Sequence, residues 1–78
     1  MSKIPHELAE EFPAEVEKLK SLKASDGHFA RLVEEYEAVN EKIYRSENRL
    51  DLISEEDEEH LRVKRAGLKD HIWRHLRD

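Results

Sequence analysis

The sequence predicts an all-α protein, an antiparallel helical hairpin with coiled-coil character, preceded by a shorter N-terminal helix. Three observations predict this fold class. Apolar residues recur every three or four positions through most of the chain, which is the spacing of one helix face. The 78 residues include only two glycines and two prolines, and β-branched residues, which favour sheets, are few. Two long helical segments are joined by a connection short enough to make them antiparallel neighbours.

The length of 78 residues limits the chain to one small helical domain, residues 1–78. A domain of this size buries only about 60% of the surface that its unfolded chain exposes, so its core is thin. Hydrophobic residues make up 37% and charged residues 42% of the sequence, which approaches the composition of disordered chains. Because the apolar residues are patterned at helical spacing, the sequence favours a folded hairpin.

The first helical segment is expected over residues 5–23, with Ser2 as its N-cap and Pro5 in its first turn, where a missing N–H costs nothing. Pro13 removes a backbone donor and crowds the carbonyl four residues earlier, which predicts a kink or restart near Phe12. Apolar residues keep their helical spacing across this break, so both pieces are expected to lie on one surface. They are Leu8, Phe12, Val16, Leu19 and Leu22.

The second segment, residues 26–50, follows a bend in which Ser25 and Asp26 are good N-caps and Gly27 is flexible. Its apolar residues follow a seven-residue repeat, which is typical of a helix that packs along another helix. They are Phe29, Leu32, Tyr36, Val39, Ile43 and Leu50. Ser46 interrupts the stripe, so the far end of this helix is expected to pack less well.

The third segment, residues 54–77, is expected to begin at Ser54, an N-cap with Asp57 in a variant of the capping box. Its inward stripe consists of Leu61, Leu68, Ile72 and Leu76. We call the stripe residues of the second and third segments, taken together, the seam. Arg65 falls on the same stripe, where its stem can lie over apolar surface while its head group reaches water. Trp73 lies beside the stripe and either covers the end of the hairpin or anchors a second chain.

The charge of the third segment is divided along its length. Residues 55–59 are all acidic, whereas residues 61–78 carry six Lys or Arg and two Asp, a local net charge of +4. This order is the one that the helix dipole favours. The basic part allows an alternative function, as a nucleic-acid or ribonucleoprotein accessory protein, because phosphate contacts need clustered Lys and Arg. The net charge of −5 for the whole chain argues against nucleic acid as a partner.

Candidate catalytic and metal-ligating residues are few. His71 and His75 lie four apart, so both can point along one helix face as metal ligands do, but histidines near a helix C-terminus also simply complement the dipole. Metal held by this pair from two chains stays open as an alternative. Cysteine is absent, and no glycine-rich phosphate loop, GxSxG or HExxH motif occurs. We therefore expect no enzyme activity, no catalytic residue, no metal site and no cofactor.

The N-terminal stretch Met1–Phe12 has no apolar region of the kind found in secretory signal peptides, and no segment approaches the roughly 20 apolar residues of a membrane span. We therefore expect a soluble, cytoplasmic protein with no membrane partner.

Four stretches carry a resemblance to a known family. They are the bend Asp26–Phe29, the pair Glu35–Tyr36, the turn Ile43–Arg45, and Arg65–Ile72 with its Leu-Lys-Asp triplet. In these motifs the chain resembles the YdcH family of small bacterial proteins, over about Phe12 to Leu76. The resemblance implies a helical hairpin with coiled-coil character and no particular activity, since that family has no settled biochemical function. Gly67 departs from the family pattern, which often places a better helix former there.

The sequence thus favours a non-enzymatic interaction or structural module. Two helices enclose little interior, so the N-terminal segment, a second copy or another protein must cover the apolar surface that remains. We expect the seam to pack helices together, and the partner to be either a second copy, with a dimer favoured, or an unknown protein.

Overall fold

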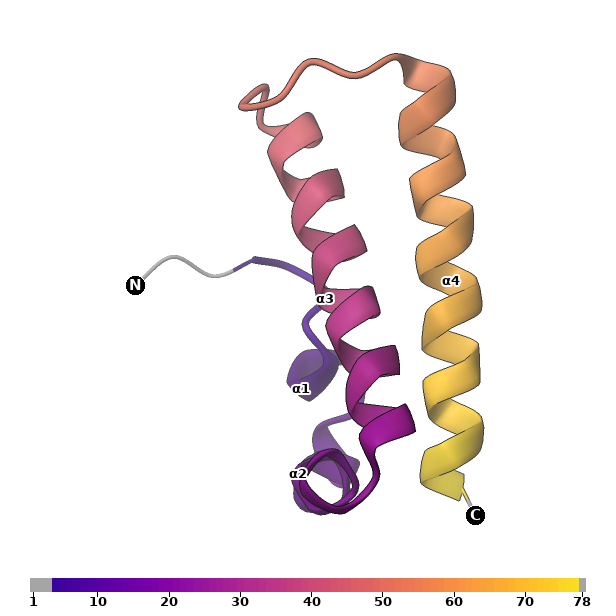
Figure 1. Ribbon diagram of the computed structural model, residues 1–78. Coiled ribbons are helices and arrows are strands. Elements are labelled where there is room, and N and C mark those ends of the chain that lie inside the picture. Colours follow the sequence, from indigo (N-terminus) through magenta and orange to yellow (C-terminus); the bar gives the residue numbers. More distant parts are fainter. Residues whose placement is uncertain (1–3, 78) are drawn as a thin grey trace.

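The computed structural model describes residues 4–77, in which the elements follow one another as α1, η1, α2, α3 and α4. The long helices α3 (Gly27–Glu47) and α4 (Glu55–Arg77) run antiparallel as a hairpin. The N-terminal elements lie beside the first half of α3 (Figure 1), and they also contact the last half of α4. No strand occurs among the described residues. The predicted all-α hairpin with an additional N-terminal helix is confirmed.

The N-terminal segment is broken at Pro13, as predicted. Helix α1 (Leu8–Glu11) ends at Phe12, whose φ of −130° and ψ of 63° are not helical. Pro13 then begins a 3-10 turn, η1 (Pro13–Glu15), which leads into α2 (Val16–Ser25). The break is a restart rather than a kink, because a proline cannot donate the backbone hydrogen bond that would continue α1. The expected cap Ser2 lies outside the described residues.

Both long helices begin at side-chain caps that the sequence predicts. The Asp26 carboxylate accepts hydrogen bonds from the backbone N–H groups of His28 and Phe29, at 3.0 and 3.2 Å. At the start of α4 the Ser54 hydroxyl oxygen accepts a hydrogen bond from the N–H of Asp57 at 3.0 Å. Each cap satisfies donors that have no partner inside the helix.

Helix α3 ends at Glu47, three residues before the predicted end at Leu50. The N–H of Leu50 donates to the carbonyl of Arg45 at 2.8 Å, and the N–H of Arg49 donates to the carbonyl of Ser46 at 3.1 Å. This pair of bonds is a Schellman motif, in which one residue adopts a left-handed conformation. Arg49 does so here, with a φ of 60°. Leu50 is therefore outside the helix and 58% exposed, and its prediction as a seam residue was wrong.

The core lies where the hairpin meets the N-terminal helices. It combines Leu8 and Leu19 from the N-terminal helices with buried residues of α3 and α4; these are Phe29, Leu32, Val33, Tyr36, Ile72 and Leu76. Phe12, Leu22 and Leu68 pack against this cluster. The ring of Trp73 stacks on that of Phe12, with centroids 5.4 Å apart and an interplanar angle of 8°. Trp73 thus covers the end of the hairpin within its own chain.

Candidate interaction site

The seam residues lie inside the protein. Seven of them are buried: Phe29, Leu32, Tyr36, Val39, Ile43, Ile72 and Leu76. Leu61 and Leu68 are half-buried between the two long helices, and only Leu50 is fully displaced to the surface. The chain itself therefore covers the apolar stripe that the sequence assigns to helix packing, and any surface for a partner lies elsewhere.

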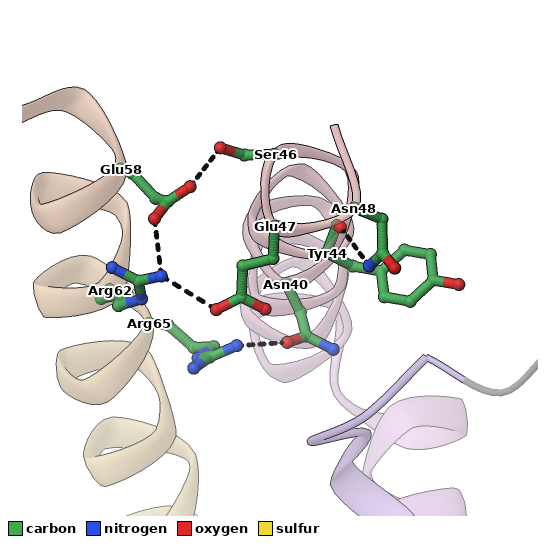
Figure 2. A network of polar contacts seen from close by, with 8 residues as sticks. All are labelled: Asn40, Tyr44, Ser46, Glu47, Asn48, Glu58, Arg62 and Arg65. Carbon is green, nitrogen blue, oxygen red and sulfur yellow. Dashed lines mark hydrogen bonds and ion pairs between the residues drawn. The ribbon is translucent and has the colours of Figure 1, made fainter. Parts of the chain in front are cut away.

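Polar side chains join α3 to α4 above the core (Figure 2). Arg62 donates to Glu47 at 2.9 Å and to Glu58 at 2.6 Å, and the hydroxyl of Ser46 donates to Glu58. The bonds from Ser46 and Arg62 hold the pKa of Glu58 below its ordinary value. The sequence pattern expects leucine at position 46. Ser46 instead joins α3 to α4 through a polar contact, beyond the point where the apolar contacts end.

Asn40 is a buried polar residue, only 4% exposed, that connects three parts of the chain. Its side-chain oxygen accepts a hydrogen bond from Arg65 of α4 at 2.8 Å (Figure 2). Its amide nitrogen donates to the backbone carbonyl of Pro5 at 2.9 Å. Both ends of the Asn40 amide are satisfied, so a buried polar group is compatible with the stability of the core. The sequence analysis expects the head group of Arg65 to reach water. In the structure this head group donates a hydrogen bond to Asn40 of α3.

Residues 5–12, which we call the strap, are held across both long helices. The hydroxyl of Tyr36 donates to the His6 carbonyl at 2.5 Å, and burial raises the pKa of Tyr36 to about 12. Glu11 forms an ion pair with Lys69 of α4 at 2.7 Å. The hydrogen bond from Lys69 holds the pKa of Glu11 below its ordinary value. The strap is thus fixed to α3 by hydrogen bonds and to α4 by an ion pair.

The connection between α3 and α4, residues 48–54, exposes three large apolar side chains, and we call it the tip. Leu50, Leu52 and Ile53 are 58%, 90% and 39% exposed. Leu52 and Ile53 also line an open hollow of about 630 Å³ beside Leu61, at the upper end of the hairpin. Isolated exposed leucines are ordinary, but apolar side chains gathered at one end of a small protein are typical of contact surfaces.

Acidic groups surround the tip. Residues 47–59 contain seven carboxylates and one arginine, a net charge of −6. The backbone turn is braced by Arg45, which forms an ion pair with Asp51 at 2.8 Å. The hydrogen bond from Arg45 keeps the pKa of Asp51 below its ordinary value, so this carboxylate is ionised at neutral pH. Glu47 and Glu58 are likewise paired, with Arg62, and Lys42 and Lys64 line the hollow beside Leu52 and Ile53. The tip therefore presents apolar side chains next to an acidic rim whose remaining carboxylates, Glu55, Glu56, Asp57 and Glu59, come from the first turns of α4.

The hairpin that carries this surface also matches a known family. Residues 29–76, which span α3 from its third residue, the tip and almost all of α4, match the family model described as a protein of unknown function, DUF465. The chain belongs to the DUF465 family. This is the family of small YdcH-like helical proteins, so the resemblance noted in the sequence is confirmed. No curated protein and no solved structure matches the chain. Among the described residues, no helix of this DUF465 protein is long and apolar enough to cross a membrane.

The basic side chains of α4 in the DUF465 hairpin mostly contact other protein groups. Besides Arg62, Arg65 and Lys69, whose partners are given above, Lys64 pairs with Glu35 at 3.3 Å and Arg74 with Asp70 at 2.9 Å. These contacts use residues of α1, α3 and α4. The basic part of α4 is thus divided among several intramolecular pairs rather than gathered into one surface.

Three histidines meet where α3 begins and α4 ends. The ring centroids of His71 and His75 are 5.3 Å apart, and those of His28 and His75 are 6.2 Å apart. Nδ1 of His75 lies 3.1 Å from the carbonyl oxygen of His71. Within residues 4–77, however, no group of three or more His, Cys, Asp or Glu side chains is arranged to hold a metal ion. The nearness of His28 to His75 could not be read from the sequence.

Sequence reasoning missed two features, the exposed tip and the buried Asn40. It assigned Leu50 to the seam and did not single out Leu52 or Ile53, although three apolar residues beside an acidic run and an N-cap are a local signal. It also missed Asn40, which follows Tyr36 by four residues and precedes Ile43 by three. A polar residue at that spacing falls on the buried face of a helix and indicates a specific hydrogen-bond partner.

Proposed function

We propose that this protein is a non-enzymatic interaction module whose tip binds a positively charged segment of another protein. The observation that carries the proposal is the exposure of Leu50, Leu52 and Ile53 together at the tip. Apolar surface gains about 25 cal/mol per Å² when it leaves water, so a partner that covers these side chains is favoured. The tip connects α3 to α4, and the contacts of Arg62 with Glu47 and Glu58 hold these two helices together next to it.

The charge of the rim specifies the chemistry of the partner. The four carboxylates of the rim that form no ion pair within the described residues, Glu55, Glu56, Asp57 and Glu59, attract a segment that carries Lys or Arg next to its own apolar residues. Such a rim speeds the encounter with a basic partner and repels acidic ones, while the buried apolar contact supplies affinity. No comparable observation favours the nucleic-acid alternative, because most basic side chains of α4 are already paired.

Site-specific photo-cross-linking in living cells tests the proposal. A benzophenone-bearing residue is placed at Leu52, and a matched control places it at Glu34, which is exposed in the middle of α3. We expect a discrete adduct from position 52 that is missing from position 34. Adding Ile53→Asp to the position 52 variant should remove the adduct, because it puts a charge inside the apolar contact without touching the core.

The chemistry of the captured protein provides a second check. The cross-linked segment, identified by mass spectrometry, should be basic. When the irradiation is repeated in a lysate of the same cells, raising the salt concentration should weaken capture. Identical bands from positions 52 and 34, or an adduct from position 52 that survives Ile53→Asp, would refute the tip as a specific interaction site.

A further inference from the structure

We propose that a second copy of the chain docks antiparallel along the outer face of α4 and forms a twofold-symmetric dimer. The outer face consists of exposed residues on the side of α4 turned away from α3: Glu59, Val63, Ala66, Gly67, Asp70 and Arg74. Figure 1 shows α3 on one side of α4 and no helix on the opposite side. The proposed contact shares Glu56 and Glu59 with the acidic rim but includes no apolar residue of the tip, so the inference goes beyond the proposed function and leaves Leu50, Leu52 and Ile53 free.

A protruding side chain and a hollow lie on this part of α4. Val63 is 66% exposed although it sits in the middle of a well-formed helix. A hollow of about 340 Å³, lined by Phe12, Ala66, Lys69, Asp70 and Trp73, opens about two turns further along α4. Its surface is mainly apolar because the stacked Phe12 and Trp73 rings and the Ala66 methyl group contribute to it.

Twofold symmetry brings Val63 of each copy against α4 of the other. When a symmetry axis passes beside Ala66 and Gly67, antiparallel helices place Val63 of one copy level with Asp70 of the other, at the edge of the hollow. The same contact occurs a second time, because every contact across a twofold axis is made twice. Val63 then packs beside Ala66 and Gly67 of the facing helix, as side chains of paired helices normally do.

Charge selects the antiparallel arrangement. The same axis places Glu59 level with Arg74 of the second copy, and Glu56 level with Arg77. Within residues 4–77, Glu56, Glu59 and Arg77 take part in no ion pair, and Arg74 has a highly exposed contact with Asp70. A parallel pair in the same register would instead bring like charges together, because α4 is acidic in its first turns and basic in its last.

Gly67 supports the close approach of two helices at the axis. Glycine is the poorest helix former after proline, so its place inside α4 needs a reason. A Cβ atom built at Gly67 has no heavy atom within 4 Å in this chain, and the fold of one copy therefore does not require glycine there. At the axis, glycine lets the backbone of a second helix come close, which brings Val63 against Ala66 and Asp70 of the second copy.

Disulfide trapping tests the geometry, and the absence of cysteine from the chain makes the result unambiguous. Two cysteines form a disulfide only when their Cα atoms lie within about 7 Å. Ala66→Cys lies next to the axis and should give a covalent dimer on mild oxidation. Ala38→Cys, a matched change at an exposed position in α3, should stay monomeric. Equal yields of dimer from the two variants would overturn the proposal.

Charge exchange tests the register. Glu59→Arg and Arg74→Glu should each weaken dimerisation at least about tenfold in sedimentation equilibrium, since each creates two like-charge contacts. The double variant should restore dimerisation, because it re-forms both pairs with reversed sign. Glu34→Arg, the same change on α3, should have no effect on the measured mass. A double variant that dimerises no better than the single ones would refute the register.

A third variant separates docking from folding. Gly67→Leu should raise the thermal unfolding midpoint of the monomer at low concentration, because leucine is a better helix former and meets no neighbour in the chain. The same change should abolish the dimer by filling the axis. Retention of the dimer would overturn the proposal, as would a monomeric wild type at all concentrations.

Failure of this inference is distinguishable from failure of the proposed function. Loss of disulfide trapping while Leu52 still captures a basic partner would remove the α4 dimer alone. A dimer that dissociates on Leu52→Asp but tolerates Gly67→Leu would show that copies meet through the tip, which also overturns this inference.

Discussion

Replacement of Asn40 should cost a large share of the stability of this protein. Asn40→Ala removes a hydrogen bond with the charged Arg65 and a neutral one with the Pro5 carbonyl. Bonds to charged groups contribute about 1.5–3 kcal/mol and neutral ones about 0.5–1.5 kcal/mol, so we expect a loss of about 2–4 kcal/mol. A chain of this length has a free energy of unfolding of about 4–12 kcal/mol. The thermal midpoint should fall by roughly 10–30 °C.

Urea unfolding, followed by helical circular dichroism and by Trp73 fluorescence, measures this loss. Asn48→Ala is the matched control, because Asn48 is exposed and its amide donates only to the Tyr44 carbonyl within α3 (Figure 2). We expect its cost to stay below about 1 kcal/mol.

A double-mutant cycle with Arg65→Met isolates the contact between Asn40 and Arg65. The coupling energy should be about 1.5–3 kcal/mol, since either change alone removes the same bond. Equal costs for Asn40→Ala and Asn48→Ala, or a coupling energy near zero, would refute the reasoning that Asn40 joins α3 to α4.

Three further predictions concern the ends of the helices and the strap. Arg49→Gly should raise the free energy of unfolding by about 0.5–1 kcal/mol, because glycine adopts the left-handed conformation without steric cost; an unchanged or lower urea midpoint would contradict this. Ser54→Ala should lower the thermal midpoint by several degrees through loss of an N-cap of about 1 kcal/mol, and an unchanged melting curve would exclude that role. The pKa of Glu11 is lowered from 4.5 by Lys69, so the stability of their pair is present at neutral pH and lost as the pH falls below about 4.5 through the folded-state pKa. Trp73 fluorescence should report the release of the strap in acid, and Lys69→Met should remove this transition; an identical acid titration in the variant would disprove the link.

The sequence predicts those parts of the fold that local chemistry decides. Asp26 and Ser54 are short polar residues directly before helical apolar patterns, so the starts of α3 and α4 follow from capping alone. The end of α3 does not. Its left-handed residue is Arg49 rather than the usual glycine, and the apolar pattern continues to Leu50, so composition gives no stop signal.

The contacts between the strap and the long helices could not be predicted, because the sequence does not show which distant residues become neighbours. Asn40 and Tyr36 bind backbone carbonyls of the strap, and every residue offers such an acceptor, so side-chain types cannot identify the partner. Lys69 reaches Glu11 of α1, which becomes its neighbour only after Pro13 has redirected the chain. The exposed tip likewise depends on where α3 ends. Because the predicted end lay three residues too late, Leu50 was predicted to be buried although it is exposed.

The sequence separation of the contacts made by the strap predicts the order in which this chain folds. Its contacts join residues far apart in sequence, 35 positions between Pro5 and Asn40 and 58 between Glu11 and Lys69, whereas the contacts of Arg62 with α3 span 15. Short loops close at lower entropic cost, so the hairpin should form first and the strap should dock on it last. Amide protons of the strap should then exchange with solvent through local openings that leave α3 and α4 intact. A strap that exchanged only on global unfolding would instead belong to the folding nucleus.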